Sequence, residues 1–117
     1  MARTAVIVDD HAGFRAQAAR LLTAAGYDVL ASCADGRTAV ETIVGLTPDL
    51  VLLDVQLPDI DGFAVLALVG AAGPSVVLVS TREAADYGGR IARSGAAGFL
   101  SKADLSAPAL ARLVPAP

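Results

Sequence analysis

Three acidic residues, one hydroxyl and one lysine stand at the ends of short apolar runs. They are Asp9, Asp10, Asp54, Ser80 and Lys102. Neighbouring carboxylates repel one another, and a cation between them relieves the repulsion. Mg²⁺ prefers such oxygen ligands and commonly takes phosphate oxygens as well. A lysine ammonium and a hydroxyl would stabilise the other oxygens of a phosphoryl group. The pattern therefore predicts phosphoryl transfer onto a carboxylate, with Asp54 as the nucleophile.

Five apolar runs supply the strands that would position these residues. The runs are Ala5–Val8, Val29–Ala31, Leu50–Leu53, Val76–Val79 and Gly98–Leu100. Most are continuous rather than alternating, which is typical of a parallel sheet covered on both faces. The carboxyl ends of parallel strands share one edge of the sheet, and ligands bind there.

Helical patterns of 3.6-residue spacing separate the runs. Five helices are predicted, within Phe14–Ala25, Asp35–Val44, Gly62–Val69, Ala84–Ala92 and Ser106–Val114. Ser106 is the expected N-cap of the last helix, and Pro115 its stop. Gly88 and Gly89 fall inside the fourth helix, where they would allow either close packing or a marginally stable helix. The alternation predicts an α/β fold: a three-layer, doubly wound (βα)5 flavodoxin-like domain with strand order 2-1-3-4-5.

Length and composition restrict the function classes. The 117 residues fit one domain, with a body over residues 1–114 and a frayed tail over 115–117. The net charge of −3 without a basic cluster argues against direct nucleic-acid binding. No apolar run approaches the roughly 20 residues of a membrane span. The only cysteine, Cys33, fits a buried thiol in the cytoplasm, the expected localisation.

Four stretches of the sequence resemble the receiver domain of bacterial two-component response regulators. They are Val6–His11, Leu52–Gly62, Val79–Thr81 and Gly98–Lys102. They stand in family order along essentially the whole chain. The opening Asp-Asp-His and the closing Ser-Lys-Ala-Asp-Leu are most similar to receivers of NarL/LuxR-type regulators, which usually carry a helix-turn-helix output domain. The 117 residues hold no such domain.

The resemblance implies a phosphoacceptor site with a divalent metal, Mg²⁺ or Mn²⁺. Asp54 would accept the phosphoryl group from a sensor histidine kinase. Asp10 would ligate the metal directly, Asp9 through water, and the Gln56 backbone carbonyl would join Asp54 as a further ligand. The residues expected to hold the phosphoryl group are Ser80, Thr81 and Lys102.

The resemblance also implies a switch. Ser80 and Phe99 would be its pair, the hydroxyl moving toward the phosphoryl group and the ring turning inward. Gln56 and Arg82 would tune dephosphorylation. The responding surface would combine the fourth helix, fifth strand and fifth helix. A homodimer or protein partner is expected there or at the first and fifth helices.

Three positions depart from the family pattern. Ala103 follows Lys102 where a cis proline is usual, so a trans bond or an altered loop is expected. Thr81 replaces a smaller residue and could narrow the path for the phosphodonor. Phe99 replaces the frequent tyrosine, so no phenol hydroxyl is expected to report the switch.

These residues also allow other interpretations. The chain could be a pseudo-receiver, acting as a protein-interaction module without phosphorylation. An enzyme is disfavoured, because Gln56 replaces the second acid of an aspartate-based phosphatase and no Gly-x-Gly-x-x-Gly follows the first strand. His11 is interpreted as an exposed residue at a helix start. Asp59 and Asp61 are interpreted as loop and helix caps rather than metal ligands.

Overall fold

A single parallel sheet of five strands organises the chain. The computed structural model describes residues 2–70 and 73–115. The strand order is β2-β1-β3-β4-β5, as predicted from the sequence. The strands are β1 (Arg3–Val8), β2 (Tyr27–Cys33), β3 (Leu50–Asp54), β4 (Ser75–Ser80) and β5 (Gly98–Ser101). The predicted α/β doubly wound fold is therefore confirmed.

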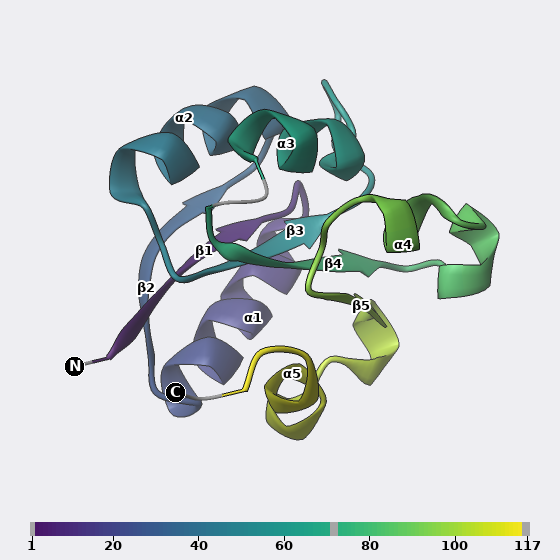
Figure 1. The fold of residues 1–117 in the computed structure, drawn as a ribbon. Coiled ribbons are helices and arrows are strands. Elements are labelled where there is room, and N and C mark those ends of the chain that lie inside the picture. The colour runs from purple at the N-terminus through teal and green to yellow at the C-terminus, as the bar shows by residue number, and fades with distance from the viewer. Residues whose placement is uncertain (1, 71–72, 116–117) are drawn as a thin grey trace.

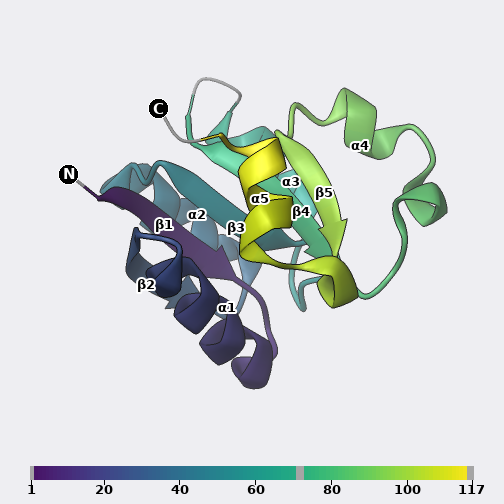
Figure 2. The same cartoon turned by 90° about the horizontal axis from the view of Figure 1, so that it is seen from below.

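Helices cover both faces of this sheet and make the three layers. The α-helices are α1 (Ala12–Ala24), α2 (Gly36–Leu46), α3 (Gly62–Val69), α4 (Arg90–Arg93) and α5 (Ala107–Leu113). Two 3-10 turns, η1 (Ala84–Tyr87) and η2 (Lys102–Asp104), follow β4 and β5. In Figure 1, α2 and α3 lie above the sheet while α1 and α5 lie below it. Figure 2 shows the lower layer, with α1 and α5 in front of the strands.

The core consists of two aliphatic clusters, one on each face of the sheet. Along β1, Val6 and Val8 belong to the cluster under α2 and α3, and Ala5 and Ile7 to the cluster under α1 and α5. All four residues are fully buried. Successive strand residues point to opposite faces, so continuous apolar runs are what a sheet covered on both sides requires.

The predicted single fourth helix is wrong. The chain instead forms the short turn η1 and the one-turn helix α4, separated by Gly88 and Gly89. Gly88 has a φ of 57°, a left-handed conformation that ends the first turn. Two adjacent glycines make a continuous helix costly there. Most residues of the segment are exposed, and partly buried Tyr87 packs against the core cluster under α2 and α3.

The ends of the helices follow the predicted caps. Ser106 Oγ accepts a hydrogen bond from the Ala109 amide at 3.1 Å, so Ser106 is the N-cap of α5. After α5, the Pro115 carbonyl accepts a hydrogen bond from Arg3 Nη1 at 3.1 Å. The rest of the predicted frayed tail, residues 116 and 117, lies outside the described residues. Within the described ranges, every helix is too short or too polar to cross a membrane.

Candidate functional site

The acidic residues predicted from the sequence meet at the carboxyl edge of the sheet. Val8 of β1 lies in register with Leu53 of β3, so the residues that follow them are neighbours. Ligand atoms of Asp9, Asp54 and Asp10, together with one of the adjacent His11, all lie within 4.8 Å of one another. Asp9 and Asp54 are buried, whereas Asp10 remains open to solvent. The edge therefore holds a partly open cluster of carboxylates.

The only lysine of the chain lies in this cluster. Lys102 Nζ is 2.6 Å from Asp9 Oδ2 and 3.5 Å from Asp54 Oδ2. Its side chain is 12% exposed. On its other side, the ammonium lies 4.5 Å from the centre of the Phe14 ring, a cation–π contact from α1. The sequence pattern did not predict the contribution of Phe14. The ammonium is thus held between two carboxylates and an aromatic ring.

Burial and charge together alter the ionisation of Asp54. Loss of hydration, followed by the nearby Asp9 carboxylate, raises the pKa of Asp54 from 3.8 to about 6. The Gln56 amide, which donates to Asp54 Oδ1 at 3.2 Å, and Lys102 partly oppose this increase. The ionised carboxylate is therefore held at a cost, which a further cation would reduce.

The cluster fits a hard divalent cation. Its carboxylates offer the oxygen ligands that Mg²⁺ and Mn²⁺ accept, and the exposed Asp10 leaves a side open for water. Among the described residues, buried Asp9 Oδ2 has no hydrogen-bond donor, and the Lys102 ammonium at 2.6 Å is its closest charged partner. His11 lies at the margin: its side chain is 70% exposed, and Nδ1 is 3.3 Å from Asp10 Oδ1. The interpretation of His11 as an exposed helix-start residue is confirmed, since it is the N-cap residue of α1.

Comparison with known proteins identifies this arrangement. The family profile of the response regulator receiver domain matches residues 5–112. The chain belongs to this family.

Individual relatives agree with the family assignment. The DNA-binding transcriptional activator EvgA of Escherichia coli K12 is 35% identical over 100 residues, covering 84% of this chain and 49% of EvgA. A protein-glutamate methylesterase/protein-glutamine glutaminase of Archaeoglobus fulgidus is 36% identical over 102 residues, covering 85% of this chain and 29% of that protein. The signal receiver domain of the response regulator NarL from Mycobacterium tuberculosis has a TM-score of 0.83 at 32% identity, covering 97% of this chain and 93% of that one.

The similarity to these relatives covers the receiver domain only. EvgA and NarL bear out the resemblance to NarL/LuxR-type receivers. The chain spans 49% of EvgA and 29% of the methylesterase/glutaminase, so the whole-protein activities of these relatives are not carried over to it. What the family establishes is a receiver domain with an acidic cluster of Asp9, Asp10 and Asp54 beside Lys102. Such a cluster is consistent with the divalent metal site typical of receivers.

The hydroxyl predicted for the receiver site has an unexpected partner. Ser80 is fully buried at the end of β4. Its Oγ accepts a hydrogen bond from the Arg82 amide at 3.0 Å and lies 2.7 Å from the hydroxyl oxygen of Tyr87. The expectation that Phe99, which lacks a hydroxyl, leaves the switch without a reporting phenol stays a prediction, but Tyr87 brings a phenol hydroxyl to Ser80. Neither the residue type of Tyr87 nor its position in a predicted helix indicated a hydrogen bond to Ser80.

The remaining predicted residues of the receiver lie around the cluster. Gln56, two residues after Asp54, is exposed, as are Thr81 and Arg82. The hydrogen bond that Arg82 makes at this edge comes from its backbone. Phe99 is partly buried on β5, with its ring centre 5.8 Å from that of Tyr87. The roles assigned to these four residues stay predictions.

The loop after Lys102 accommodates the missing proline. None of the described peptide bonds is cis, which agrees with the expected trans bond before Ala103. The chain continues instead into η2, where Ser101 Oγ donates to Asp104 Oδ2 at 2.9 Å. This local turn keeps Lys102 at the sheet edge without a proline.

Two further acids of the receiver act as caps, as predicted. Asp61 accepts a hydrogen bond from the Ala64 amide at 2.9 Å and is the N-cap of α3. Asp59 accepts from the amides of Gly36 and Arg37 at 2.8 and 2.9 Å, and these bonds lower its pKa to about 2. Neither acid belongs to the carboxylate cluster around Asp54.

Gly62 allows the loop after β3 to fold back against the site. A Cβ atom at this position would lie 2.4 Å from the Asp54 carbonyl oxygen. The Gly62 amide instead donates to the Val55 carbonyl at 2.7 Å. Only glycine permits this close approach, so Gly62 fixes the path of the chain after Asp54.

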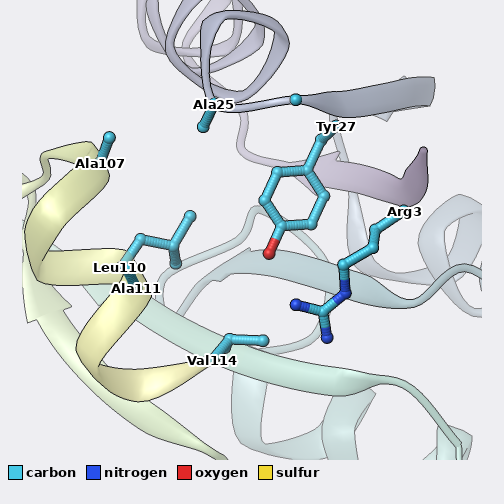
Figure 3. A pocket seen from close by; sticks show the side chains of 8 residues that line it. Arg3, Ala25, Tyr27, Ala107, Leu110, Ala111 and Val114 are labelled. Atoms are coloured by element: carbon cyan, nitrogen blue, oxygen red, sulfur yellow. The ribbon is translucent and has the colours of Figure 1, made fainter. Parts of the chain in front are cut away.

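A separate pocket lies at the other edge of the sheet. It is lined by apolar side chains that include Leu110 of α5 and its C-cap residue Val114, and by Arg3 and Tyr27 at the start of β1 and β2 (Figure 3). Arg3 lies 5.8 Å from the centre of the Tyr27 ring. No carboxylate or histidine lines the pocket. It shares no residue with the cluster around Asp54.

Proposed function

We propose that this receiver is the phosphoacceptor of a two-component system, with Asp54 taking the phosphoryl group from a sensor histidine kinase. The observation that carries the proposal is the meeting of Asp54 with Asp9, Asp10 and Lys102 at one sheet edge. An isolated acidic pair would be explained by helix capping. A buried carboxylate between a second acid and the only lysine is explained by phosphoryl chemistry.

The proposed step is a substitution at phosphorus. A carboxylate oxygen of Asp54 attacks the phosphorus of the donor and forms an O–P bond. The P–N bond of a phosphohistidine, or the P–O bond of acetyl phosphate, breaks, and its electron pair leaves with the imidazole or acetate. A bound Mg²⁺ or Mn²⁺ would neutralise charge on the transferring phosphoryl oxygens. No substrate turns over, so the domain is a phosphoacceptor rather than an enzyme.

Each residue of the site has a defined task in this step. Asp9, Asp10, Asp54 and the backbone carbonyl of Gln56 would hold the metal. The phosphoryl oxygens would be bound by Lys102, Ser80 and Thr81. Lys102 is already within 3.5 Å of the nucleophile, so its charge compensates the carboxylate before a phosphoryl group arrives. Gln56 and Arg82, both exposed, would control access of hydrolytic water.

Phosphorylation would then shift a two-state equilibrium of the receiver. Ser80 would move toward the phosphoryl group, and Phe99 would turn inward. The responding surface is α4, β5 and α5, with α1 and α5 as the alternative contact for a homodimer or protein partner. Leu110 of α5 and its C-cap residue Val114 are buried in the core, so the exposed residues of α5 are Ala107, Pro108, Ala111 and Arg112. The proposed partners are proteins in the cytoplasm, without direct contact to nucleic acid or membrane.

The test is phosphorylation with a small donor. The protein is incubated with acetyl phosphate and Mg²⁺, and its intact mass is followed over time. A single phosphoryl group is expected on the wild type. It should be absent with a chelator and absent in Asp54→Asn. A folded wild-type protein that takes no phosphoryl group would contradict the proposal and favour the pseudo-receiver alternative.

Metal titration separates the same two alternatives. A phosphoacceptor should bind Mg²⁺ weakly, and only with Asp54 and Asp10 intact. Asp28→Asn, a change at an exposed position of β2, is the matched control and should leave binding unchanged. Equal binding by Asp10→Asn and wild type would count against the metal site.

A further inference from the structure

The Ser80 hydroxyl makes hydrogen bonds to the Arg82 amide and the Tyr87 hydroxyl. A serine hydroxyl has one proton to donate and two lone pairs to accept with. The Arg82 amide occupies one lone pair, and Tyr87 takes part in a second hydrogen bond at 2.7 Å. Among the described residues, the hydrogen bonds of the Asp54 carboxylate come from Gln56 and Lys102 and not from Ser80. In this structure Ser80 is therefore engaged with Tyr87 and not with the nucleophile.

Tyr87 also packs the segment between β4 and β5 against the rest of the domain. Its ring lies between those of Phe63 on α3 and Phe99 on β5, with both centre-to-centre distances 5.8 Å. The other residues of η1 and the glycines that follow are exposed. A single tyrosine thus links the Ser80 hydroxyl, the Phe99 ring and the interrupted helix.

We propose that Tyr87 is a latch that competes with the phosphoryl group for the Ser80 hydroxyl. A phosphoryl oxygen is only an acceptor, so Ser80 must donate its proton to it and turn away from Tyr87, whichever of the two hydroxyls donates in the Ser80–Tyr87 bond. Drawing Ser80 toward Asp54 weakens the bond to Tyr87 and releases the η1 turn. The inference deepens the proposed function, on which it rests, by naming the residue that transmits the change to the segment preceding β5.

Because the Tyr87 ring contacts both Phe63 and Phe99, loss of the Ser80–Tyr87 hydrogen bond would affect the packing of these rings. If Phe99 turns inward, it must move relative to a Tyr87 ring that it already contacts. Arg90 adds a second attachment, since its guanidinium lies 4.2 Å from the centre of the Phe63 ring and 3.4 Å from Asp61. Both Arg90 and Asp61 are about half exposed, so this attachment is weak. Loss of the Tyr87 bond therefore leaves η1 and α4 held mainly by aromatic contacts.

Tyrosine content makes the latch directly observable. The chain has two tyrosines and no tryptophan. Labelling with 3-fluorotyrosine gives two ¹⁹F resonances, assigned with Tyr27→Phe and Tyr87→Phe. Beryllofluoride with Mg²⁺ serves as the probe for the phosphorylated state, and binding to Asp54 is checked with Asp54→Asn. We expect the Tyr87 resonance to shift on binding, while that of Tyr27, at the opposite sheet edge, stays in place.

The affinity for beryllofluoride is the second readout. Tyr87→Phe keeps the ring between Phe63 and Phe99 but removes the competing hydroxyl. The variant should bind beryllofluoride about 2- to 10-fold more tightly, the equivalent of one hydrogen bond. Tyr27→Phe is the matched control, and its affinity should equal that of the wild type.

The outcomes distinguish the latch from the phosphoacceptor function. Binding to Asp54 with an unmoved Tyr87 resonance, or with equal or weaker affinity in Tyr87→Phe, overturns the latch and leaves the proposed function standing. Failure of the wild type to bind beryllofluoride at Asp54, together with no labelling by acetyl phosphate, overturns the proposed function and the latch with it.

Discussion

Replacement of Asp54 by asparagine should stabilise the metal-free protein at neutral pH. Burial and the Asp9 carboxylate raise the pKa of Asp54 from 3.8 to about 6 in the folded protein. The folded state therefore binds the Asp54 proton more tightly than the unfolded state does. This contribution to stability is full below the unfolded pKa and is lost as the pH rises through the folded pKa.

The size of the effect follows from the difference between 6 and 3.8, about 2.2 pKa units. Each unit corresponds to about 1.36 kcal/mol, so an ionised Asp54 costs about 3 kcal/mol at neutral pH. Asparagine has nearly the same shape and no charge, and its side-chain oxygen can still accept from the Gln56 amide. The advantage of Asp54→Asn should fall to roughly 0.5 kcal/mol near pH 4, where the folded wild type is already protonated.

The assay is urea unfolding in the presence of a chelator, at pH values near 7.5 and near 4. Asp28→Asn controls for the general effect of removing an exposed carboxylate, and its unfolding free energy should stay within about 0.5 kcal/mol of the wild type. An Asp54→Asn variant no more stable than the wild type at neutral pH would refute the reasoning. An equally large advantage at both pH values would also refute it, because the cause would not be ionisation.

Three further changes test the surroundings of the site. Gly62→Ala should lower the unfolding free energy by about 1–3 kcal/mol, measured by urea unfolding, because the added methyl group meets the Asp54 carbonyl. Gly45→Ala is the control: its methyl group lies in open space on α2, so it should not lower the unfolding free energy. Lys102→Met should cost about 3 kcal/mol by leaving the buried Asp9 unpaired, and adding Asp9→Asn should restore stability but not phosphorylation. Phe14→Leu should slow labelling by acetyl phosphate about 2- to 10-fold through loss of the cation–π contact, and an unchanged rate would count against that role.

The positions of the site residues could be predicted because the sheet is regular. Apolar runs identified the strands, and parallel strands in the order 2-1-3-4-5 share one carboxyl edge. Asp9 follows β1, Asp54 ends β3 and Lys102 follows β5, all at the carboxyl edge of the sheet, so their meeting could be predicted from the topology. The caps at Asp61 and Ser106 were equally local, since each depends on an amide three residues further along.

The contacts that cross between elements could not be predicted in this way. Tyr87 reaches Ser80 because Gly88 ends the helical turn, which the spacing of apolar residues did not show. The Phe14–Lys102 contact depends on the side-chain conformations of two separate elements. The pKa of Asp54 depends on its degree of burial, which only packing determines. The spacing of residues in the sequence thus predicted where the site lies, while side-chain packing determines the pKa of Asp54 and the contacts of Tyr87 and Lys102.

The most direct test locates the modified atom. After reaction with acetyl phosphate and Mg²⁺, hydroxylamine converts an aspartyl phosphate to a hydroxamate, and peptide mass spectrometry identifies the residue that carries it. The hydroxamate should appear on Asp54 alone and disappear when the metal is chelated. A hydroxamate on Asp9 or Asp10, or none on any aspartate, would contradict the account.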